Sequence, residues 1–418
     1  MPDGERTRVM PDTRTAVVDA SAAPAPGAPL SPTVRALGVV SLFADVSSEM
    51  VYAVNPEFVT RILGAPAWAL GIIEGIAEST ASLLKPVAGW FSDRSGRRKP
   101  FAVTGYGLSA VGKPLLALAG TWWHVMGARF LDRVGKGIRT APRDALIAES
   151  CHPADRGRAF GFHRGMDTVG AVLGPLIGYF LMLAMPGGFR ALYLAAFVPA
   201  LIGVLVLAVA VRERGRAHTA QPRAAAERAA LKGLSPAYRR YLLVVALFGL
   251  GNSSDAFLLL RARDMGVQPE HLLLLYAAFN VVEACLAWLG GSLSDRAGRQ
   301  PVIAAGWTVF AIVYLGFALG AGPATAWTLF LAYGLYYTLT QGSQRALAAD
   351  LAHPDRRAAE IGAFHLVVGL AAFPASLAAG LLYEHVSHKA PFLLGGATAA
   401  ASALLLLVLL PRPAARPA

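Results

Sequence analysis

The sequence predicts an all-α integral membrane protein with 12 transmembrane helices, arranged as two pseudo-repeated six-helix bundles. Three observations support this fold: an apolar composition, apolar segments of membrane-spanning length, and an internal sequence repeat. Hydrophobic residues make up 55% of the 418 residues and charged residues 15%, whereas an average soluble domain has about 25% charged residues. The mean hydropathy of +0.49 leads to the same conclusion, that the bilayer is the solvent suited to this chain.

Apolar segments long enough to cross a bilayer recur along the chain. Several exceed the ~20 residues that a crossing needs, so we expect those helices to be tilted or to project beyond the bilayer. The predicted spans, in chain order, are 34–60, 67–91, 101–120, 122–148, 157–184, 190–211, 240–262, 270–291, 301–321, 324–350, 358–384 and 391–410. An even number of spans places both termini on one side of the membrane.

A charged segment separates the first six spans from the last six. It is rich in alanine, arginine and glutamate, and no apolar span lies within it. The first thirty residues lack the apolar core of a signal peptide and have the composition of a disordered tail. The predicted domains are a disordered cytoplasmic tail at 1–33, a six-helix bundle at 34–211, a cytoplasmic linker at 212–238, a second six-helix bundle at 239–411 and a cytoplasmic tail at 412–418.

The distribution of lysine and arginine predicts the orientation in the membrane. The linker and one set of alternate connections are rich in basic residues, as cytoplasmic connections are. The opposite connections hold only Arg61, Arg190, Arg261, Arg263 and Lys389. We therefore expect a multi-pass protein of the bacterial inner membrane with both termini in the cytoplasm. This pattern accounts for the net charge of +12, and no nucleic-acid partner is expected.

The two halves repeat in sequence at a spacing of about 201–206 residues, which chance does not maintain over three sites. The related pairs are 46–49 with 252–255, 89–97 with 291–299, and 162–163 with 364–365. Two parallel repeats of six helices place a binding site at their interface near the bilayer midplane. The first pair puts Asp255 at the position equivalent to Glu49.

The turn after the second span reads GWFSDRSGRRK at residues 89–99. Its glycines permit close packing and a chain turn, and its aspartate can meet a helix N-terminus or an arginine. The segment resembles the signature Gly-x-x-x-Asp-Arg-x-Gly-Arg-Arg of the major facilitator superfamily, with a weaker copy at 291–299. The resemblance covers about 34 to 411 and implies transport by alternating access.

In that family this turn is a conformational latch. The residues that the resemblance assigns to it are Gly89, Asp93, Arg94, Gly96, Arg97, Arg98, Asp295 and Arg296. The alternative is that some of the basic residues, Arg98 and Lys99 above all, only fix the topology.

The fifth span carries small residues at regular spacing. They are Gly170, Gly174, Pro175 and Gly178, and they resemble the antiporter signature of drug–proton exporters in the same superfamily. That signature usually ends in two glycines, and here Tyr179 replaces the second. Glycine and proline let neighbouring helices approach and bend. At this span the motif favours export over uptake.

Charged residues recur at three- and four-residue spacing along the fourth span and form one stripe on a helix. They are Arg129, Asp132, Arg133, Lys136, Arg139 and Arg143. A charge at the bilayer centre costs roughly 2.5–3.5 kcal/mol on insertion scales. The stripe therefore has to face a wet cavity or acidic partners rather than lipid.

Acidic residues on other spans are candidate partners. They are Asp45 and Glu49 on the first span, Glu74 and Glu78 on the second, Asp167 on the fifth and Asp255 on the seventh. Because the first and fourth spans run antiparallel, we expect Asp45 and Glu49 to form ion pairs with the stripe at Arg129 and Arg133.

Two interpretations of these charges remain open. In one, they neutralise each other and only hold the half together or switch partners as it moves. In the other, a carboxylate carries the coupling proton while Arg133 or Lys136 holds an anionic group, since burial and a neighbouring cation act on a carboxylate in opposite directions. The proton-coupling candidates are Glu49, Asp45, Glu78, Glu74 and Asp255. The substrate-binding candidates are Arg129, Arg133, Lys136, Asp132 and Asp167.

The sequence thus predicts a transporter that exports a small organic solute or drug, by proton antiport with alternating access. The alternative is a carrier, for uptake or efflux, of a phosphorylated, carboxylated or siderophore-like anion. We expect small-molecule substrate, protons and membrane lipid as partners, and a monomer. An enzyme is not expected, because no nucleophile–base pair, zinc-binding helix or phosphate loop is visible. The two cysteines, Cys151 and Cys285, show no metal-ligand spacing, and no metal or cofactor is expected.

Overall fold

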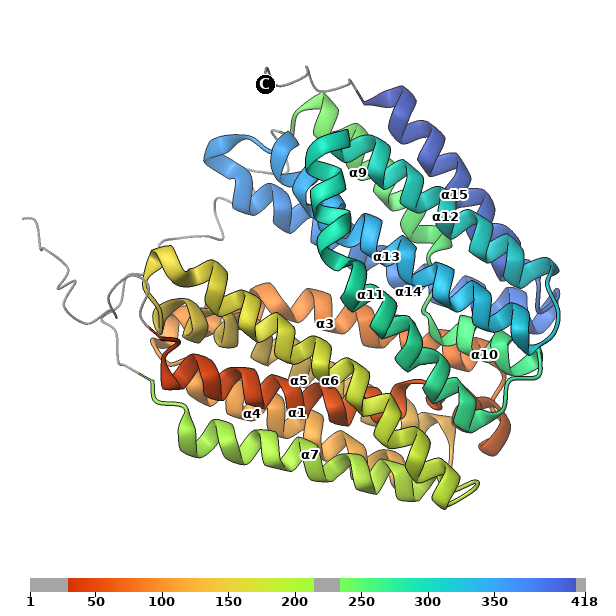
Figure 1. Cartoon of the computed structure of the whole chain (residues 1–418), viewed down its shortest axis with the longest axis horizontal. Helices are drawn as coiled ribbons and strands as arrows, with labels where there is room; N and C mark the ends of the chain where they lie inside the picture. The colour runs from red at the N-terminus through yellow and green to blue at the C-terminus, as the bar shows by residue number, and fades with distance from the viewer. Residues whose placement is uncertain (1–28, 214–233, 411–418) are drawn as a thin grey trace, which may run out of the picture.

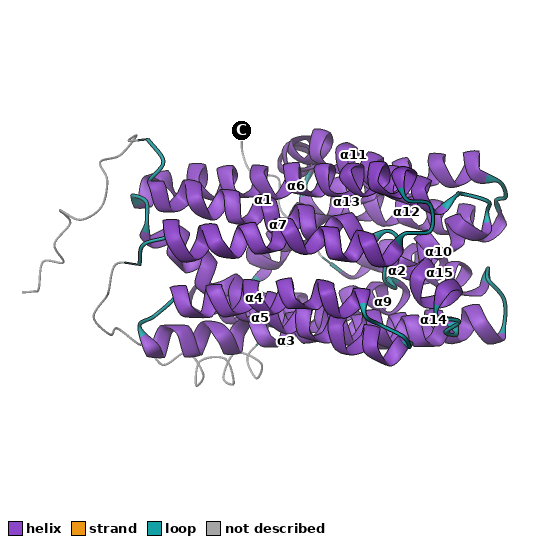
Figure 2. Cartoon of the chain, turned by 90° about the horizontal axis from the view of Figure 1, so that it is seen from below, coloured by secondary structure: helices purple, strands orange, loops and turns teal. Residues whose placement is uncertain are grey.

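The computed structural model describes residues 29–213 and 234–410. All regular elements of these two ranges are helices, which confirms the predicted all-α fold (Figure 2). The predicted tails at 1–33 and 412–418 and the linker at 212–238 lie wholly or in large part outside the described residues.

The first half contains six membrane-length helical units. They are α1 (Pro32–Tyr52) with the short α2 (Asn55–Glu57) and a π-helical turn at Phe58–Ile62, then α3 (Ala67–Ser95), α4 (Lys99–Ala117), α5 (Trp122–Glu149), α6 (Arg156–Ala184) and α7 (Phe189–Ala210). The sequence sets several of these starts. The Ser31 hydroxyl accepts a bond from the Val34 amide at 3.2 Å, and Pro32 follows it at the first helical position, where its missing N–H costs nothing.

The second half repeats this arrangement. Its helices are α9 (Pro236–Gly251) with α10 (Ala256–Asp264), α11 (Pro269–Ala297), α12 (Arg299–Leu319), α13 (Pro323–Leu351), α14 (Arg357–His385) and α15 (Ala390–Leu409). The break between α9 and α10 interrupts one span, as the bend between α1 and α2 does in the first half. Discontinuous helices of this kind are common beside the binding sites of membrane transporters.

Hydropathy separates the described helices into two groups. Seven are long and apolar enough to cross a membrane, or eight when α1 and its continuation, bent by 42°, count as one span. Four further long helices, α3, α4, α5 and α13, complete the twelve predicted spans. These four are more polar because they carry many of the charged and hydroxyl side chains buried inside the protein.

The helices of each half run side by side, and those of the second half are inclined to those of the first (Figure 1). We call the side of the bundle on which α1 begins and α15 ends the terminal side, and the opposite side the far side. In the first half α1 packs against α6 and α7, and α5 packs against α3 and α4. The two halves meet where α3 lies along α14 and α6 lies along α11, and their ribbons diverge toward the left of Figure 1.

Polar contacts join the halves on the far side. Arg61 pairs with Asp264 at 2.9 Å, and Arg263 pairs with Glu57 at 3.1 Å. The two ion pairs connect the end of the bent first span to α10, so they close the far side in this conformation. Within the second half, the hydroxyl of Tyr383 also donates to Asp264.

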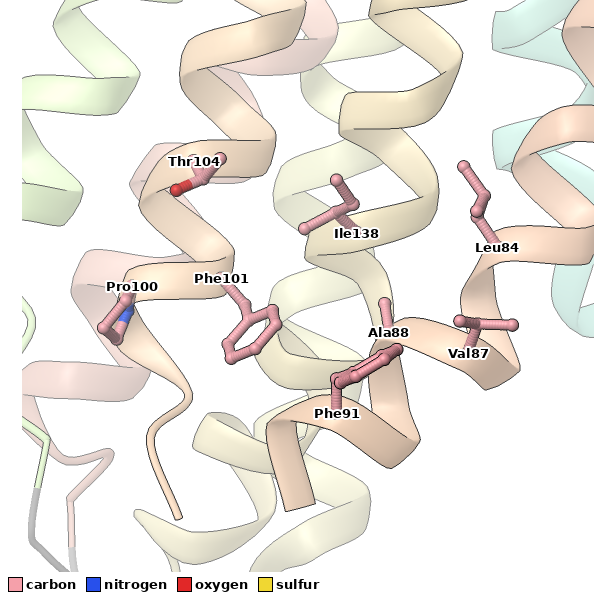
Figure 3. Close-up of a pocket in the computed structure, with 8 residues that line it drawn as sticks. All are labelled: Leu84, Val87, Ala88, Phe91, Pro100, Phe101, Thr104 and Ile138. Carbon is pink, nitrogen blue, oxygen red and sulfur yellow. The ribbon is translucent and has the colours of Figure 1, made fainter. Parts of the chain in front are cut away.

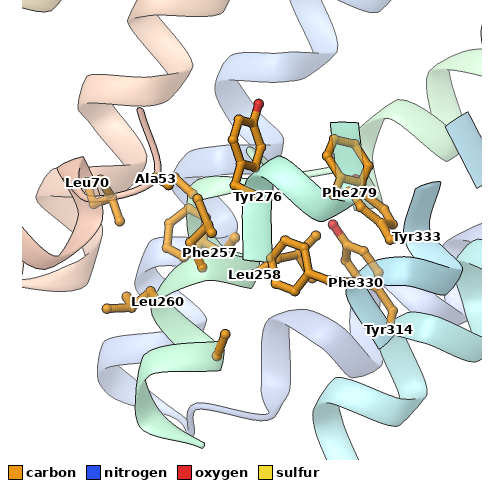
Figure 4. Packing of buried hydrophobic residues seen from close by; sticks show 14 of the residues in the cluster. Ala53, Leu70, Phe257, Leu258, Leu260, Tyr276, Phe279, Tyr314, Phe330 and Tyr333 are labelled. Atoms are coloured by element: carbon orange, nitrogen blue, oxygen red, sulfur yellow. The ribbon is translucent and has the colours of Figure 1, made fainter. Parts of the chain in front are cut away.

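Buried aromatic and aliphatic side chains form a core that continues from one half into the other. Figure 4 shows part of it, in which Phe257 lies next to Ala53 of the first half, and Phe279 lies beside Tyr333. The core extends through the second half to the terminal side, where Tyr238 and Leu410 belong to it. It supports the polar residues that line the interface between the halves.

Candidate functional site

A polar cavity lies between α1 and α5 in the first half. Its lining residues are Asp45, Ser48, Glu49 and Tyr52 from α1 and Arg129, Asp132, Arg133, Lys136 and Arg139 from α5. The cavity volume is about 30 Å³, which accommodates about a water molecule rather than an organic solute. In this conformation the charged side chains therefore fill most of the space between the two helices.

The charged stripe of α5 faces the protein interior. Arg129, Asp132, Arg133 and Arg139 are each at most 8% exposed. This confirms the argument from insertion cost, because charges on the lipid-facing side would lack any partner.

The partners of these arginines differ from those expected from the sequence. Arg129 pairs with Glu74 through two contacts of 2.7 and 2.9 Å, and Arg133 pairs with Glu78 at 3.3 Å. Both carboxylates belong to α3, so the expected pairing of Asp45 and Glu49 with these arginines is wrong. The reason is geometric: α3 packs along α5 and projects its two glutamates, one turn apart, onto the stripe.

Local contacts position two more charged side chains of this region. Lys113 of α4, which is buried, lies 3.7 Å from Asp132. Arg139 donates to the Ser109 hydroxyl at 3.0 Å, and its guanidinium lies 4.2 Å from the centroid of the Tyr106 ring. Arg139 is therefore held by neutral groups and keeps its charge uncompensated by a direct ion pair among the described residues.

Besides Arg139, three charged residues of the cavity have no ion-pair partner within the described part of the chain. They are Asp45, Glu49 and Lys136, and all three line the same space. One carboxylate oxygen of Glu49 is buried without any hydrogen-bond partner, while the hydroxyl of Tyr276 on α11 faces this side chain from the other half. Asp45 and Glu49 are half-buried and Lys136 is exposed. Because a partly buried charge without a partner is costly, protonation or a bound ligand can stabilise the two carboxylates.

The glycines of the antiporter-type motif bring α6 into backbone contact with this part of α1. A Cβ atom at Gly170, Gly174 or Gly178 would lie 2.7 Å from a carbonyl oxygen of α1, which belongs to Leu42, Val46 or Met50, respectively. Only glycine allows such an approach. The contact holds α6 beside Asp45 and Glu49, and Pro175 is buried in the same helix.

Asp167 lies on α6 near this cavity but does not line it. Its carboxylate is 3.5 Å from Nδ1 of His163, one turn earlier. Its negative charge also acts on Asp45. The structure therefore places Asp167 beside the candidate proton carriers.

Asp255 belongs to a separate cluster in the second half. It lies at the break between α9 and α10, where it accepts hydrogen bonds from Tyr333 at 2.7 Å and Tyr337 at 3.1 Å. These tyrosines were not among the predicted site residues. Tyr336 and Tyr337 follow Tyr333 by three and four residues on the tenth span, and this spacing places them on one helix face.

Tyr52 lies between the two groups of charges. Its ring centroid is 5.8 Å from the guanidinium carbon of Arg129 and 5.1 Å from the ring centroid of Tyr276. The neighbouring Ser254 donates to Glu74 at 3.3 Å, which links the Arg129 pair to the second half. The polar cavity and the Asp255 cluster therefore form one continuous region across the interface.

The predicted latch is a network inside the first half. Arg98 pairs with Asp93 at 2.7 Å and with Glu149, at the end of α5, at 2.8 Å. Gly96 ends α3 with a φ of 63°, a conformation that favours glycine. Arg97 is exposed, and it contributes its carbonyl oxygen to bonds with the hydroxyls of serines in α3.

The remaining latch residues have weaker contacts. Gly89 faces Ala141 of α5, and Arg94 lies over the Trp90 ring at 5.6 Å.

The second copy repeats the scheme in the other half. Arg299 pairs with Asp295 at 2.6 Å and with Asp350, near the end of α13, at 3.3 Å. Arg296 lies in the last turn of α11 and is exposed.

A larger apolar cavity of about 350 Å³ lies on the terminal side of the first half, between α3, α4 and α5 (Figure 3). Its lining residues are Leu84, Val87, Ala88, Phe91, Pro100, Phe101, Thr104 and Ile138. It offers one hydroxyl and no charge, and all its lining residues belong to the first half. Its chemistry therefore suits hydrocarbon rather than a transported polar solute.

Comparisons with known proteins agree with this architecture. The sequence profile of the Major Facilitator Superfamily matches residues 37–376. An uncharacterized MFS-type transporter of Methanocaldococcus jannaschii is 36% identical over 384 residues, covering 90% of this chain and 95% of that protein.

Two further likenesses are of different kinds. The multidrug resistance protein MdtH of Proteus mirabilis is 34% identical over 155 residues, which is 36% of this chain and 38% of that protein. The crystal structure of the nucleoside transporter NupG superposes with a TM-score of 0.75 at 12% identity, covering 90% of this chain and 98% of NupG. By its profile match and its full-length relative, the chain belongs to the Major Facilitator Superfamily of membrane transporters.

Proposed function

We propose that the protein exports a small organic solute in exchange for protons, by alternating access of a site between its two halves. The observation that carries this proposal is the group formed by Asp45, Glu49 and Lys136. These three charged side chains share one cavity and have no ion-pair partner among the described residues.

Such a group is suited to exchange a proton. Burial opposes the charge of a carboxylate, and a nearby cation favours it, so a small change in surroundings can change its protonation. Lys136 is close enough to act on both Asp45 and Glu49. We assign the proton to Glu49 first, because one of its oxygens is buried without a partner.

The sign of the substrate's charge determines how protons couple to it. A cationic group and a proton are both attracted by the same negative charge, so each displaces the other and transport is an exchange. An anionic group instead binds better when the carboxylates are protonated, and then the two travel together. In both cases coupling arises because the solute binds the protonated and the deprotonated protein with different affinities.

Two features favour export. The antiporter-type glycines hold α6 against the turns of α1 that carry Asp45 and Glu49. The MdtH relative, matched over part of its length, is named for multidrug resistance. In this proposal the protein is a monomer of the bacterial inner membrane, its terminal side faces the cytoplasm, and the two Asp–Arg turn networks act as latches.

An organic anion is the second candidate substrate. Lys136 and Arg139 favour it, because both are cations without a direct ion pair in the described chain and both line the cavity. A carboxylated or phosphorylated solute would be bound by these two groups.

The test uses purified full-length protein in liposomes that contain a pH-sensitive dye. Organic cations and anions are added under an imposed proton gradient, and wild type is compared with Glu49→Gln. Glu270→Gln is the matched control, because it removes a carboxylate in the first turn of α11, outside the site.

We expect a cation to drive proton movement in wild type and in the Glu270→Gln control but not in Glu49→Gln. If an anion moves together with protons, the second candidate replaces the first. If solute moves in wild type with no proton movement at all, proton coupling is wrong.

A further inference from the structure

The two halves use the same repeat position in opposite ways. Glu49 and Asp255 are equivalent in the sequence repeat. Glu49 lies in a cavity lined by four basic side chains of α5. Asp255 instead lies among tyrosines, and no basic side chain pairs with it in the described ranges 29–213 and 234–410.

The negative charge of Asp255 is held in place but not neutralised. Each of its carboxylate oxygens accepts one tyrosine hydroxyl, from Tyr333 or Tyr337. The residue also immediately precedes α10, whose N-terminal amides favour a negative charge. These groups stabilise an ionised carboxylate without supplying a counter-charge, which leaves the position ready for a cation.

Aromatic faces surround this carboxylate. The ring centroids of Tyr333 and Tyr337 are 5.3 Å apart, and both lie near the ring of Phe279, at 5.7 and 5.4 Å. Figure 4 shows Phe279 and Tyr333 side by side, with Tyr276 next to them. Aromatic faces attract cations, and quaternary ammonium groups are commonly bound in aromatic cages.

The cluster can be reached from the interface between the halves. Asp255 and Tyr337 are half-buried, whereas Tyr333 and Phe279 are almost fully buried behind them. Tyr52, also half-buried, extends the aromatic surface toward the polar cavity through its contact with Tyr276. Tyr52 also lines the polar cavity that contains Glu49, so it connects the two regions.

We propose that Asp255, Tyr333 and Tyr337 form the subsite for a positively charged nitrogen of the transported solute, a protonated amine or a quaternary ammonium. The inference rests on the proposed function, whose substrate class it specifies. It assigns Asp255 to substrate binding, whereas the sequence placed this residue among the proton-coupling candidates. A cation here and a proton at Glu49 disfavour each other electrostatically, which produces exchange.

Binding of two probes of similar size and opposite charge tests this assignment. Benzyltrimethylammonium and benzoate are titrated calorimetrically into purified full-length protein in detergent, using wild type, Asp255→Asn and Glu270→Gln. We expect wild type and Glu270→Gln to bind benzyltrimethylammonium. Asp255→Asn should bind it at least tenfold more weakly, because the variant removes the negative charge that attracts the quaternary ammonium, which has no N–H to donate.

A second variant separates loss of charge from loss of structure. Tyr337→Phe keeps the aromatic face and removes one hydroxyl, so its affinity should fall less than that of Asp255→Asn. Thermal unfolding of each variant shows whether it is folded.

The inference is overturned if wild type binds only benzoate, if it binds neither probe, or if folded Asp255→Asn binds the cation as wild type does. Proton movement is measured separately with Glu49→Gln. If the cation binds through Asp255 while no protons move, the subsite stands and proton coupling is wrong.

Discussion

Glu74 and Glu78 provide a matched pair for testing how burial sets the cost of losing a charge partner. They lie one turn apart on α3, and each pairs with an arginine of α5, Arg129 or Arg133. Replacing either carboxylate by glutamine keeps the side-chain shape and removes one negative charge.

The two substitutions should differ in cost because the two pairs differ in burial. The Glu74 and Arg129 side chains are 2% and 6% exposed, and breaking a buried pair by removing one partner costs about 3–5 kcal/mol. The Glu78 side chain is 47% exposed, and exposed pairs contribute only about 0–1 kcal/mol. Arg133 also keeps Asp132 at 3.9 Å when Glu78 is replaced.

The free energy of unfolding in mixed micelles measures both effects. We expect Glu74→Gln to lose about 3–5 kcal/mol and Glu78→Gln less than about 1 kcal/mol. Adding Arg129→Met to Glu74→Gln should restore most of the loss, because no charge is then left without a partner. Equal losses for the two single variants, or a double variant less stable than Glu74→Gln, would refute this reasoning.

Two further substitutions test the helix contact and the far-side closure. Gly174→Val should abolish transport, because its Cβ would lie 2.7 Å from the Val46 carbonyl oxygen. Gly165→Val, where no atom lies within 4 Å of the added Cβ, should retain transport, and equal uptake into liposomes by both variants would contradict this. Asp264→Asn removes the ion pair with Arg61, which is about half-exposed, and loss of such a pair shifts the conformational ratio by about 1.4- to 5-fold toward opening. Labelling of a cysteine placed on the far side should then be faster, and an unchanged labelling rate would contradict the assigned closure.

The sequence was sufficient to predict the fold and the orientation of the α5 stripe, because both follow from transfer energies. Span lengths and the cost of charges in lipid leave few alternatives, and Arg129 and Arg133 are buried as expected. Their partners were not predictable in the same way. Helical periodicity shows which face a residue lies on but not which helix packs against that face, so Asp45 and Glu49 were chosen where α3 supplies Glu74 and Glu78.

The Asp255 cluster illustrates a second limit. Tyr333 and Tyr337 lie on the tenth span, and nothing in their local sequence distinguishes a tyrosine that bonds a distant carboxylate from one that packs in a core. The glycine motif, in contrast, could be interpreted from its own residues. Gly170 and Gly174 predict a close helix contact by their spacing alone, and only the identity of the partner, α1, required the structure.

The small volume of the polar cavity has a consequence for measured affinities. With about 30 Å³ of free space, the polar cavity has no room for an organic solute in the conformation described. A solute that enters this cavity therefore binds a rearranged form, which is present as a fraction of the molecules. The apparent dissociation constant is then the intrinsic one divided by that fraction. A substitution that opens the cavity can therefore tighten solute binding even when its side chain does not contact the solute. To identify the residues that do contact the solute, the population of the open form has to be measured together with the affinity.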